Sequence, residues 1–266
     1  HLVAVLENII RERDAFGKNR KENPRRVNIE FVSSNPTGPL VIVSARAAAV
    51  GDTLANLMQA AGDTVEREFY VNDYGNQVLL LGKSVLARLK ELRGEAAEFP
   101  EDGYHGEYVS EIAAHIEKNF RDEIDRFDDQ EALVDFIAGK AVEYNVGGQK
   151  KDLERFNVAF DRWFSERTIH EGGEVERTLA LLESKGGVFV EEGKKVFRST
   201  DHGDDKDRVL VRDDGRPTYF LADIAYHKNK IDRGYDAIID IWGPDHHGYI
   251  ARLKAGGVVF WLTARV

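Results

Sequence analysis

The sequence predicts an α/β protein in which a helical insertion separates two parts of one sheet domain. Strand-like and helix-like segments alternate over residues 27–92, a spacing that favours parallel βαβ units. Residues 104–156 carry amphipathic helical patterns with few strand signals. Two hairpin patterns, a helix and a buried strand follow between residues 188 and 242. These observations together indicate a divided sheet.

The elements before the insertion start with an amphipathic helical pattern at residues 1–10. The apolar run VNIEFV is typical of a buried strand, and an alanine-rich helix follows the turn-rich SSNPTGP. That helix is expected to end at Gly62, because glycine adopts the left-handed conformation that often closes a helix. We expect strand, helix, strand and helix in turn at residues 27–32, 45–61, 64–71 and 77–92.

The elements of the insertion and of the second half follow the same reasoning. Helices are expected at 104–120, 130–144, 150–156 and 174–185, with a strand at 160–165. Hairpins are expected at 188–198 and 208–220, with turns at Glu191-Glu192-Gly193 and Asp213-Asp214-Gly215. A helix at 221–233 and a buried strand at 235–242 complete the order.

Composition excludes several classes of protein. The 266 residues are 42% hydrophobic and 32% charged, and no apolar run approaches the ~20 residues of a membrane span. A net charge of -10 argues against a nucleic-acid coat, although an RNA enzyme with a local basic face remains open. The absence of cysteine excludes disulfides and thiolate metal sites and fits a cytoplasmic protein. The start lacks signal-peptide features, and a first residue other than Met suggests that upstream sequence was removed.

The first candidate site lies in NIEFVSSNPTGPL, where a strand leads through a loop of small residues into a helix. The carboxyl end of a strand and the start of a helix form a crevice in which ligands bind. Glu30 could receive a guanidinium or ammonium group there, with Asn35 in the loop. The alternative is a plain turn that caps the following helix.

The second candidate site lies in TYFLADIAYH. Tyr219 and Asp223 are four residues apart and would share one face of a helix. An aromatic ring and a carboxylate on one face can hold a planar cation. A capped helix with a solvated Asp223 is the alternative reading.

The third candidate site is WGPDHHGY, which follows the last predicted strand. His246 and His247 are adjacent, and no further ligand stands at the offset of a zinc motif, so we predict no metal site. Histidines at the carboxyl end of a strand can instead stack on a base or contact phosphate. The charged run DHGDDKDRVLV is typical of an exposed turn.

Long segments, in order, resemble the bacterial arginyl-tRNA synthetases. They are EFVSSNPTGPL, EFYVNDYGNQ, EDGYHGEYVSEIA, FDRWFSER, FRSTDHGDDKDRVLVRDDGRPTYFLADIAYH and IDIWGPDHHGYIARLKA. The match covers about residues 27–255. The resemblance implies a doubly wound, Rossmann-like class I catalytic domain that joins L-arginine to tRNA(Arg) through an arginyl-adenylate. ATP with Mg²⁺ would be the co-substrate, with no tightly bound cofactor, and arginine activation in the family often requires tRNA.

The resemblance also implies roles for individual residues. An arginine pocket falls on Glu30, Asn35, Tyr219, Asp223 and Asp245. ATP contacts fall on Thr37, Gly38, Arg46, Gly243, His246 and His247. The acceptor end of tRNA is expected beside Asn72, Asp73, Asn76 and Gln77.

One departure from the family concerns its His-x-Gly-His signature, whose histidines contact the triphosphate. Val41, Ile42, Val43 and Ser44 stand there, with Arg46 retained just beyond. Valine donates no hydrogen bond to phosphate, and a β-branched side chain replaces the glycine that lets adenine stack on the backbone. Each lost donor typically costs ~10²–10³ in rate, so little adenylation is expected and no catalytic residue is assigned.

The second departure is the end of the chain, where GGVVFWLTARV no longer resembles the family. The lysine loop and the anticodon-binding domain are therefore expected to be missing. We expect a helix and linker at 1–26, the two halves of the catalytic domain at 27–91 and 183–266, and the insertion at 92–182. The alternative function is a non-catalytic, truncated paralogue that binds arginine or RNA.

Overall fold

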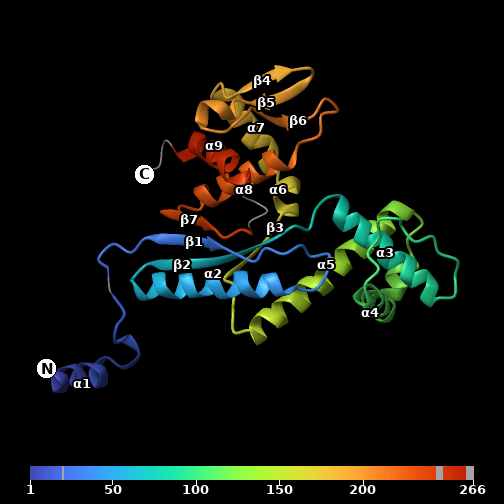
Figure 1. The fold of residues 1–266 in the computed structure, drawn as a ribbon. Coiled ribbons are helices and arrows are strands. Elements are labelled where there is room, and N and C mark those ends of the chain that lie inside the picture. The colour runs from blue at the N-terminus through green and yellow to red at the C-terminus, as the bar shows by residue number, and fades with distance from the viewer. Residues whose placement is uncertain (20, 244–247, 262–266) are drawn as a thin grey trace.

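A four-stranded parallel sheet forms the centre of the molecule (Figure 1). The computed structural model describes residues 1–19, 21–243 and 248–261. The strands run in the order β3-β2-β1-β7. They are β1 (Arg26–Glu30), β2 (Thr64–Val71), β3 (Arg162–Ser165) and β7 (Ala237–Asp240). From β1 the chain continues to β2 on one side of it, and the last strand, β7, pairs with β1 on its other side. The order of the strands therefore reverses between β1 and β7, which makes this place a topological switch point.

Helices cover both faces of this sheet, as the doubly wound fold requires. Helix α2 (Ile42–Ala60) lies along one face and α8 (Tyr219–Asp232) along the other (Figure 1). Gly51 lets α2 approach β1, since a Cβ there would lie 2.2 Å from the ring of Phe31. Helix α9 (Ile250–Trp261) packs on α8. The predicted α/β fold class is therefore confirmed.

The insertion is a bundle with its own hydrophobic core. It consists of α3 (Asn76–Leu92), α4 (Glu107–Ile124) and α5 (Gln130–Arg155). Two helices predicted within residues 130–156 are one continuous helix. The pair Gly147-Gly148 costs only ~1 kcal/mol per residue in helix propensity, and the long packing face of α5 against α3 outweighs that cost.

A second, smaller sheet lies beyond α7, in the order β4-β5-β6 and antiparallel. The segment comprises α6 (Arg167–Glu171), α7 (Glu174–Ser184), β4 (Val188–Glu191), β5 (Lys194–Phe197), η2 (Ser199–His202) and β6 (Arg208–Val211). The first predicted hairpin is confirmed. The second is only partly formed: β6 pairs with β5 on one edge, and across the turn it makes a single bridge, Val211 to Pro217. Its second arm stays short because α8 begins at Tyr219.

The ends of the insertion differ from the expected range 92–182. Strand β3 falls inside that range yet belongs to the central sheet, and α3 begins before it. The helix α1 (Leu2–Glu12), followed by η1 (Arg13–Ala15), confirms the amphipathic pattern at the start and has no buried residue. It lies away from the sheet (Figure 1). No helix within the described ranges is long and apolar enough to cross a membrane.

Candidate functional site

Three acidic side chains lie side by side at the carboxyl end of the sheet. Glu30 is the last residue of β1, and its register partners are Glu68 on β2 and Asp240 on β7. Cross-strand partners project on the same face of a sheet, and like charges directly opposite each other are destabilising. This row of carboxylates therefore needs cations from a neighbouring element.

Helix α8 supplies those cations from one face. The ammonium of Lys230 lies 2.5 Å from Glu30 and 2.7 Å from Asp240, and its side chain is fully buried. The guanidinium of Arg233 donates to both oxygens of Glu68, at 2.6 and 2.9 Å. These residues lie three apart on the helix, so their side chains leave it on the same side.

A tyrosine and a histidine complete this buried network. The hydroxyl of Tyr226 lies 2.8 Å from Glu30 and 2.8 Å from Glu68, so its single hydrogen serves one of them at a time. The Nε2 of His227 lies 3.0 Å from the carboxylate of Asp240. Burial lowers the pKa of His227, but Asp240 more than compensates, and the pKa is raised overall. Neither residue was singled out from the sequence.

Among the described residues, Asp223 sits beside this network with no lysine or arginine ion pair of its own. Burial raises its pKa to about 7, His227 lowers it, and the carboxylates of Glu166 and Glu30 raise it further. Glu166 follows β3 and is 4% exposed. The sequence placed Glu30 and Asp223 in one crevice, and the structure brings them within electrostatic reach of each other. Asp223 is only partly exposed, so the fully solvated alternative does not hold.

Tyr70 of β2 stands among the same acids. Burial raises the pKa of its hydroxyl, and Glu166, Asp223 and Glu30 raise it further, in that order. Its ring packs on Tyr226, with 4.4 Å between the ring centroids. The phenol therefore stays neutral, and it separates three carboxylates that come from three elements. Sequence reasoning missed Tyr70 and Glu166, because only the alignment of β2 and β3 places them here.

The loop after β1 begins with a strained turn. Val32 and Ser33 have φ of 68° and 41°, a conformation that is rare for residues other than glycine. The hydroxyl of Ser33 donates to Glu30 at 2.9 Å and accepts from the amide of Tyr70 at 3.1 Å. These two bonds hold the turn against the ends of β1 and β2.

Asn35 lies in the exposed part of this loop, next to two residues that were predicted to face tRNA. Its amide nitrogen donates to Gln77 at 3.2 Å, and the amide nitrogen of Asn72 lies 3.5 Å from its oxygen. The structure thus brings Asn35, Asn72 and Gln77 together. Asp73 is used differently, because its carboxylate accepts from Ser165 at 2.6 Å and from the amide of Arg167 at 3.0 Å. Those bonds join the β2 loop to the start of α6.

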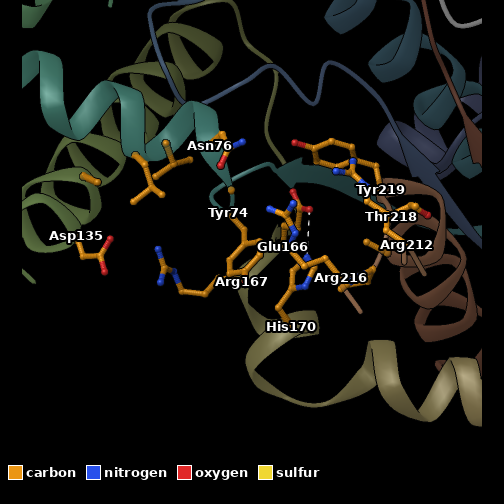
Figure 2. Close-up of a pocket in the computed structure, with 16 residues that line it drawn as sticks. Tyr74, Asn76, Asp135, Glu166, Arg167, His170, Arg212, Arg216, Thr218 and Tyr219 are labelled. Atoms are coloured by element: carbon orange, nitrogen blue, oxygen red, sulfur yellow. Dashed lines mark hydrogen bonds and ion pairs between the residues drawn. The ribbon is translucent and has the colours of Figure 1, made fainter. Parts of the chain in front are cut away.

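A cavity of about 420 Å³ opens beside Tyr219, and Figure 2 shows its lining. Tyr219, 63% exposed, lies at one end and Asp135 at the other, with Tyr74 and His170 between them (Figure 2). The rings of Tyr74 and His170 stack with their centroids 3.9 Å apart. Further polar lining comes from Asn76, Glu166, Arg167, Arg212 and Arg216. Three arginines and three aromatic rings thus line this cavity, together with two acids and several apolar side chains.

The residues predicted to contact ATP lie around the start of α2. Thr37 is buried, Gly38 follows it, and Arg46 is exposed one turn into the helix. Gly243 follows β7. Asp245, His246 and His247 lie outside the described residues.

The stretch that replaces the family signature is mostly apolar surface. Val41, Ile42 and Val43 are 64%, 85% and 56% exposed at the N-terminus of α2. Ser44 is buried, and its hydroxyl lies 2.9 Å from that of Ser34. The helix N-terminus still presents amide groups to an anion, but no side-chain donor stands at residues 41–43. These side chains do not fit a triphosphate. Across the described ranges, no group of three or more metal-binding side chains is present.

Comparison with known proteins places this geometry in one family. A family model described as "tRNA synthetases class I (R), catalytic domain" matches residues 5–252. The arginine–tRNA ligase of Leptospira interrogans serovar Lai is 53% identical over 254 residues, covering 87% of this chain and 43% of that protein. The arginine–tRNA ligase of Syntrophotalea carbinolica is 47% identical over 257 residues, covering 94% and 45%. The chain therefore spans less than half the length of these curated relatives.

Solved structures agree with this placement. A crystal structure described as an arginyl-tRNA synthetase from Campylobacter jejuni superposes with a TM-score of 0.87 at 39% identity, covering 96% of this chain and 56% of that one. The arginyl-tRNA synthetase of Thermus thermophilus gives a TM-score of 0.63 at 19% identity, over 95% and 49% of the two chains. At that identity the second likeness concerns the fold alone.

Proposed function

We propose that this chain, which belongs to the arginine family of class I tRNA synthetases, forms the arginine-binding part of an arginine–tRNA ligase. The whole reaction would activate L-arginine with ATP and Mg²⁺ and transfer it to tRNA(Arg). The observation that carries the proposal is the pair Asp223 and Glu166, two acidic residues beside a row of three carboxylates for which Lys230 and Arg233 supply two cations. A cationic substrate would neutralise the remaining charge.

In the proposed pocket, Asp223 receives the guanidinium of arginine. Tyr219 covers the flat end of the substrate, and the amide of Asn35 contacts it from the loop. Glu30 is already bonded to Lys230 and Ser33, so its part in the pocket is to add negative potential, with its remaining lone pairs as acceptors. Asp245 belongs to the pocket on the resemblance alone.

The acceptor end of tRNA is proposed to enter the cavity beside Tyr219. Three arginines suit a phosphate backbone, and the stacked pair Tyr74–His170 suits an unpaired base. Asn72, Asn76 and Gln77 would line its entrance, while Asp73 shapes the loop that carries them. The cytoplasm, where aminoacylated tRNA is used, is the proposed compartment.

ATP would approach the start of α2 and the end of β7. Thr37, Gly38, Arg46, Gly243, His246 and His247 are the proposed contacts, and Mg²⁺ would arrive on the phosphates. The exposed apolar side chains at residues 41–43 favour a second candidate function, a module that binds arginine or RNA without forming the adenylate. Pyrophosphate exchange with arginine, ATP and tRNA(Arg) all present distinguishes the two. Exchange supports the ligase, and arginine binding without exchange supports the module.

Calorimetric titration with L-arginine and L-citrulline tests the pocket, because citrulline keeps the shape and lacks the charge. We expect arginine to bind and citrulline to bind at least ~30-fold more weakly, since an unpaired buried charge costs about 2 kcal/mol or more. Asp223→Asn should weaken arginine binding to a similar extent. Asp232→Asn, at the exposed end of the same helix, is the matched control and should bind normally. Equal affinity for both ligands would refute the assignment.

A further inference from the structure

Helix α5 of the insertion holds the backbone of the loop that carries Asn35. The side-chain amide of Gln149 donates to the carbonyl oxygen of Asn35 at 3.1 Å and to that of Gly38 at 3.0 Å. The amide of Asn145, one turn earlier, donates to the carbonyl of Pro36 at 2.8 Å. An amide nitrogen carries two hydrogens, so Gln149 uses one for each carbonyl.

Helix α4 holds the remaining carbonyl of the same loop. The hydroxyl of Tyr108 donates to the carbonyl oxygen of Thr37 at 2.8 Å. Four consecutive carbonyls, those of residues 35–38, thus accept hydrogen bonds from three side chains of the inserted helices.

Burying the two side-chain amides that hold this loop is energetically costly. Gln149 is 1% exposed and Asn145 6%, so their amides are withdrawn from water. Within the described part of the chain, Oε1 of Gln149 is buried without a hydrogen-bond partner. A buried unpaired acceptor is destabilising. The amide of Gln149 nevertheless takes this orientation, which is the one that lets its nitrogen donate two hydrogen bonds to the loop.

We propose that Tyr108, Asn145 and Gln149 are positioning residues that fix the loop at residues 35–38 for substrate binding. The loop leaves β1 through the strained turn at residues 32–33, and strained backbone persists only where its surroundings hold it in place. The inserted helices thereby set where the side chain of Asn35 lies. The inference rests on the proposed arginine site, because it assigns to these residues an effect on that ligand.

Gln149→Met tests the proposal, since methionine has a similar length and no N–H group. In the ligand-free chain, we expect faster amide hydrogen exchange over residues 33–40. Arginine should bind about 5- to 30-fold more weakly, as expected for the loss of one or two hydrogen bonds. Tyr108→Phe removes a single hydroxyl and should give a smaller effect of the same sign, which covers the case in which Gln149→Met folds poorly.

Tyr144→Phe is the matched control. It makes the same change on α5, where the ring of Tyr144 packs on His115 with 5.0 Å between centroids. We expect no change in loop exchange or in arginine affinity. An effect equal to that of Tyr108→Phe would mean that any lost hydroxyl in the bundle perturbs the site, and would overturn the assignment.

A double-mutant cycle with Asn35→Ala separates positioning from general stability. If Gln149 acts through the loop that carries Asn35, its effect on arginine affinity should fall below about twofold in the Asn35→Ala background. Additive losses would overturn the proposal, and so would unchanged loop exchange in Gln149→Met. Faster exchange with unchanged arginine affinity would overturn positioning and leave the arginine site standing. Failure of the unmodified chain to bind arginine would overturn the proposed function and the positioning role with it.

Discussion

Arginine binding to this chain should strengthen as the pH rises from 6 to 8. Asp223 must be ionised to accept a cation, and its pKa is raised to about 7, first by burial and then by the charges of Glu166 and Glu30. His227 and Arg252 act in the opposite direction on the same carboxyl. Protonation of His227 at low pH would also repel the substrate, so both titrations weaken binding in acid.

The size of the effect follows from the ionised fraction. A carboxyl with a pKa of about 7 is ~10% ionised at pH 6 and ~90% ionised at pH 8, so the dissociation constant for arginine should fall by about tenfold between them. An ordinary aspartate, titrating near 3.9, would show no change over this range. The part of the slope that Asp223→Asn abolishes therefore reports the raised pKa of Asp223.

Calorimetric titration at half-unit steps from pH 5.5 to 8.5, at constant ionic strength, measures this slope. Asp223→Asn should bind weakly, and the part of the slope that comes from Asp223 should vanish in it. Affinity that is flat across the range in the unmodified chain, combined with loss of binding in Asp223→Asn, would refute the reasoning. It would mean that the carboxyl binds arginine but titrates normally.

The same residue makes a prediction about stability. The folded-state pKa of Asp223 lies above its ordinary value of 3.8, so the folded chain keeps a proton that the unfolded chain releases between about pH 4 and 7. The contribution of Asp223 to stability is therefore lost as the pH rises through that window. In urea denaturation, the stability of Asp223→Asn relative to the unmodified chain should therefore be greater at pH 8 than at pH 5.

Two further pairs of variants test the packing by urea denaturation. Gly51→Ala should destabilise the fold by about 1–3 kcal/mol, because its Cβ would meet the ring of Phe31. Gly148→Ala, with open space at its Cβ position, should stabilise the fold by about 0.5–1 kcal/mol. Equal effects of the two substitutions would contradict the close approach of α2 to β1. Lys230→Met should cost about 3–5 kcal/mol of stability, because it leaves buried carboxylates unpaired. Lys228→Met breaks one ion pair with an exposed partner and should cost less than about 1 kcal/mol. A small loss of stability in Lys230→Met would show that water solvates the carboxylates of Glu30 and Asp240 once the lysine is removed.

Local sequence patterns predicted most of the elements, because each depends on residues close together in the chain. The strands at residues 27–32 and 64–71 and the helix of α2 were confirmed within a few residues. The errors arose where tertiary contacts decide. Helix α5 continues through a glycine pair because it packs on α3, and the second arm of the second hairpin is cut short because α8 begins at Tyr219.

The candidate site was predictable only in part, for the same reason. The resemblance supplied Glu30 and Asp223, which stand 193 positions apart, and the structure brings them into electrostatic reach. The row formed by Glu30, Glu68 and Asp240 depends on the register between three strands, which no local pattern reveals. No local pattern around Lys230 shows that its ammonium is buried among these acids.

The proposed arginine pocket and most of the proposed ATP contacts lie on different pieces of this fold. The acids sit on the sheet and α8, and a buried network of ion pairs holds them in place. The residues that replace the family's phosphate contacts sit at the exposed start of α2, where their side chains contribute little to packing. Substitutions at residues 41–43 can therefore remove the proposed phosphate contacts without disturbing the buried acids. On these grounds, we expect a chain of this family to be able to keep its proposed amino-acid pocket after its adenylation site has changed.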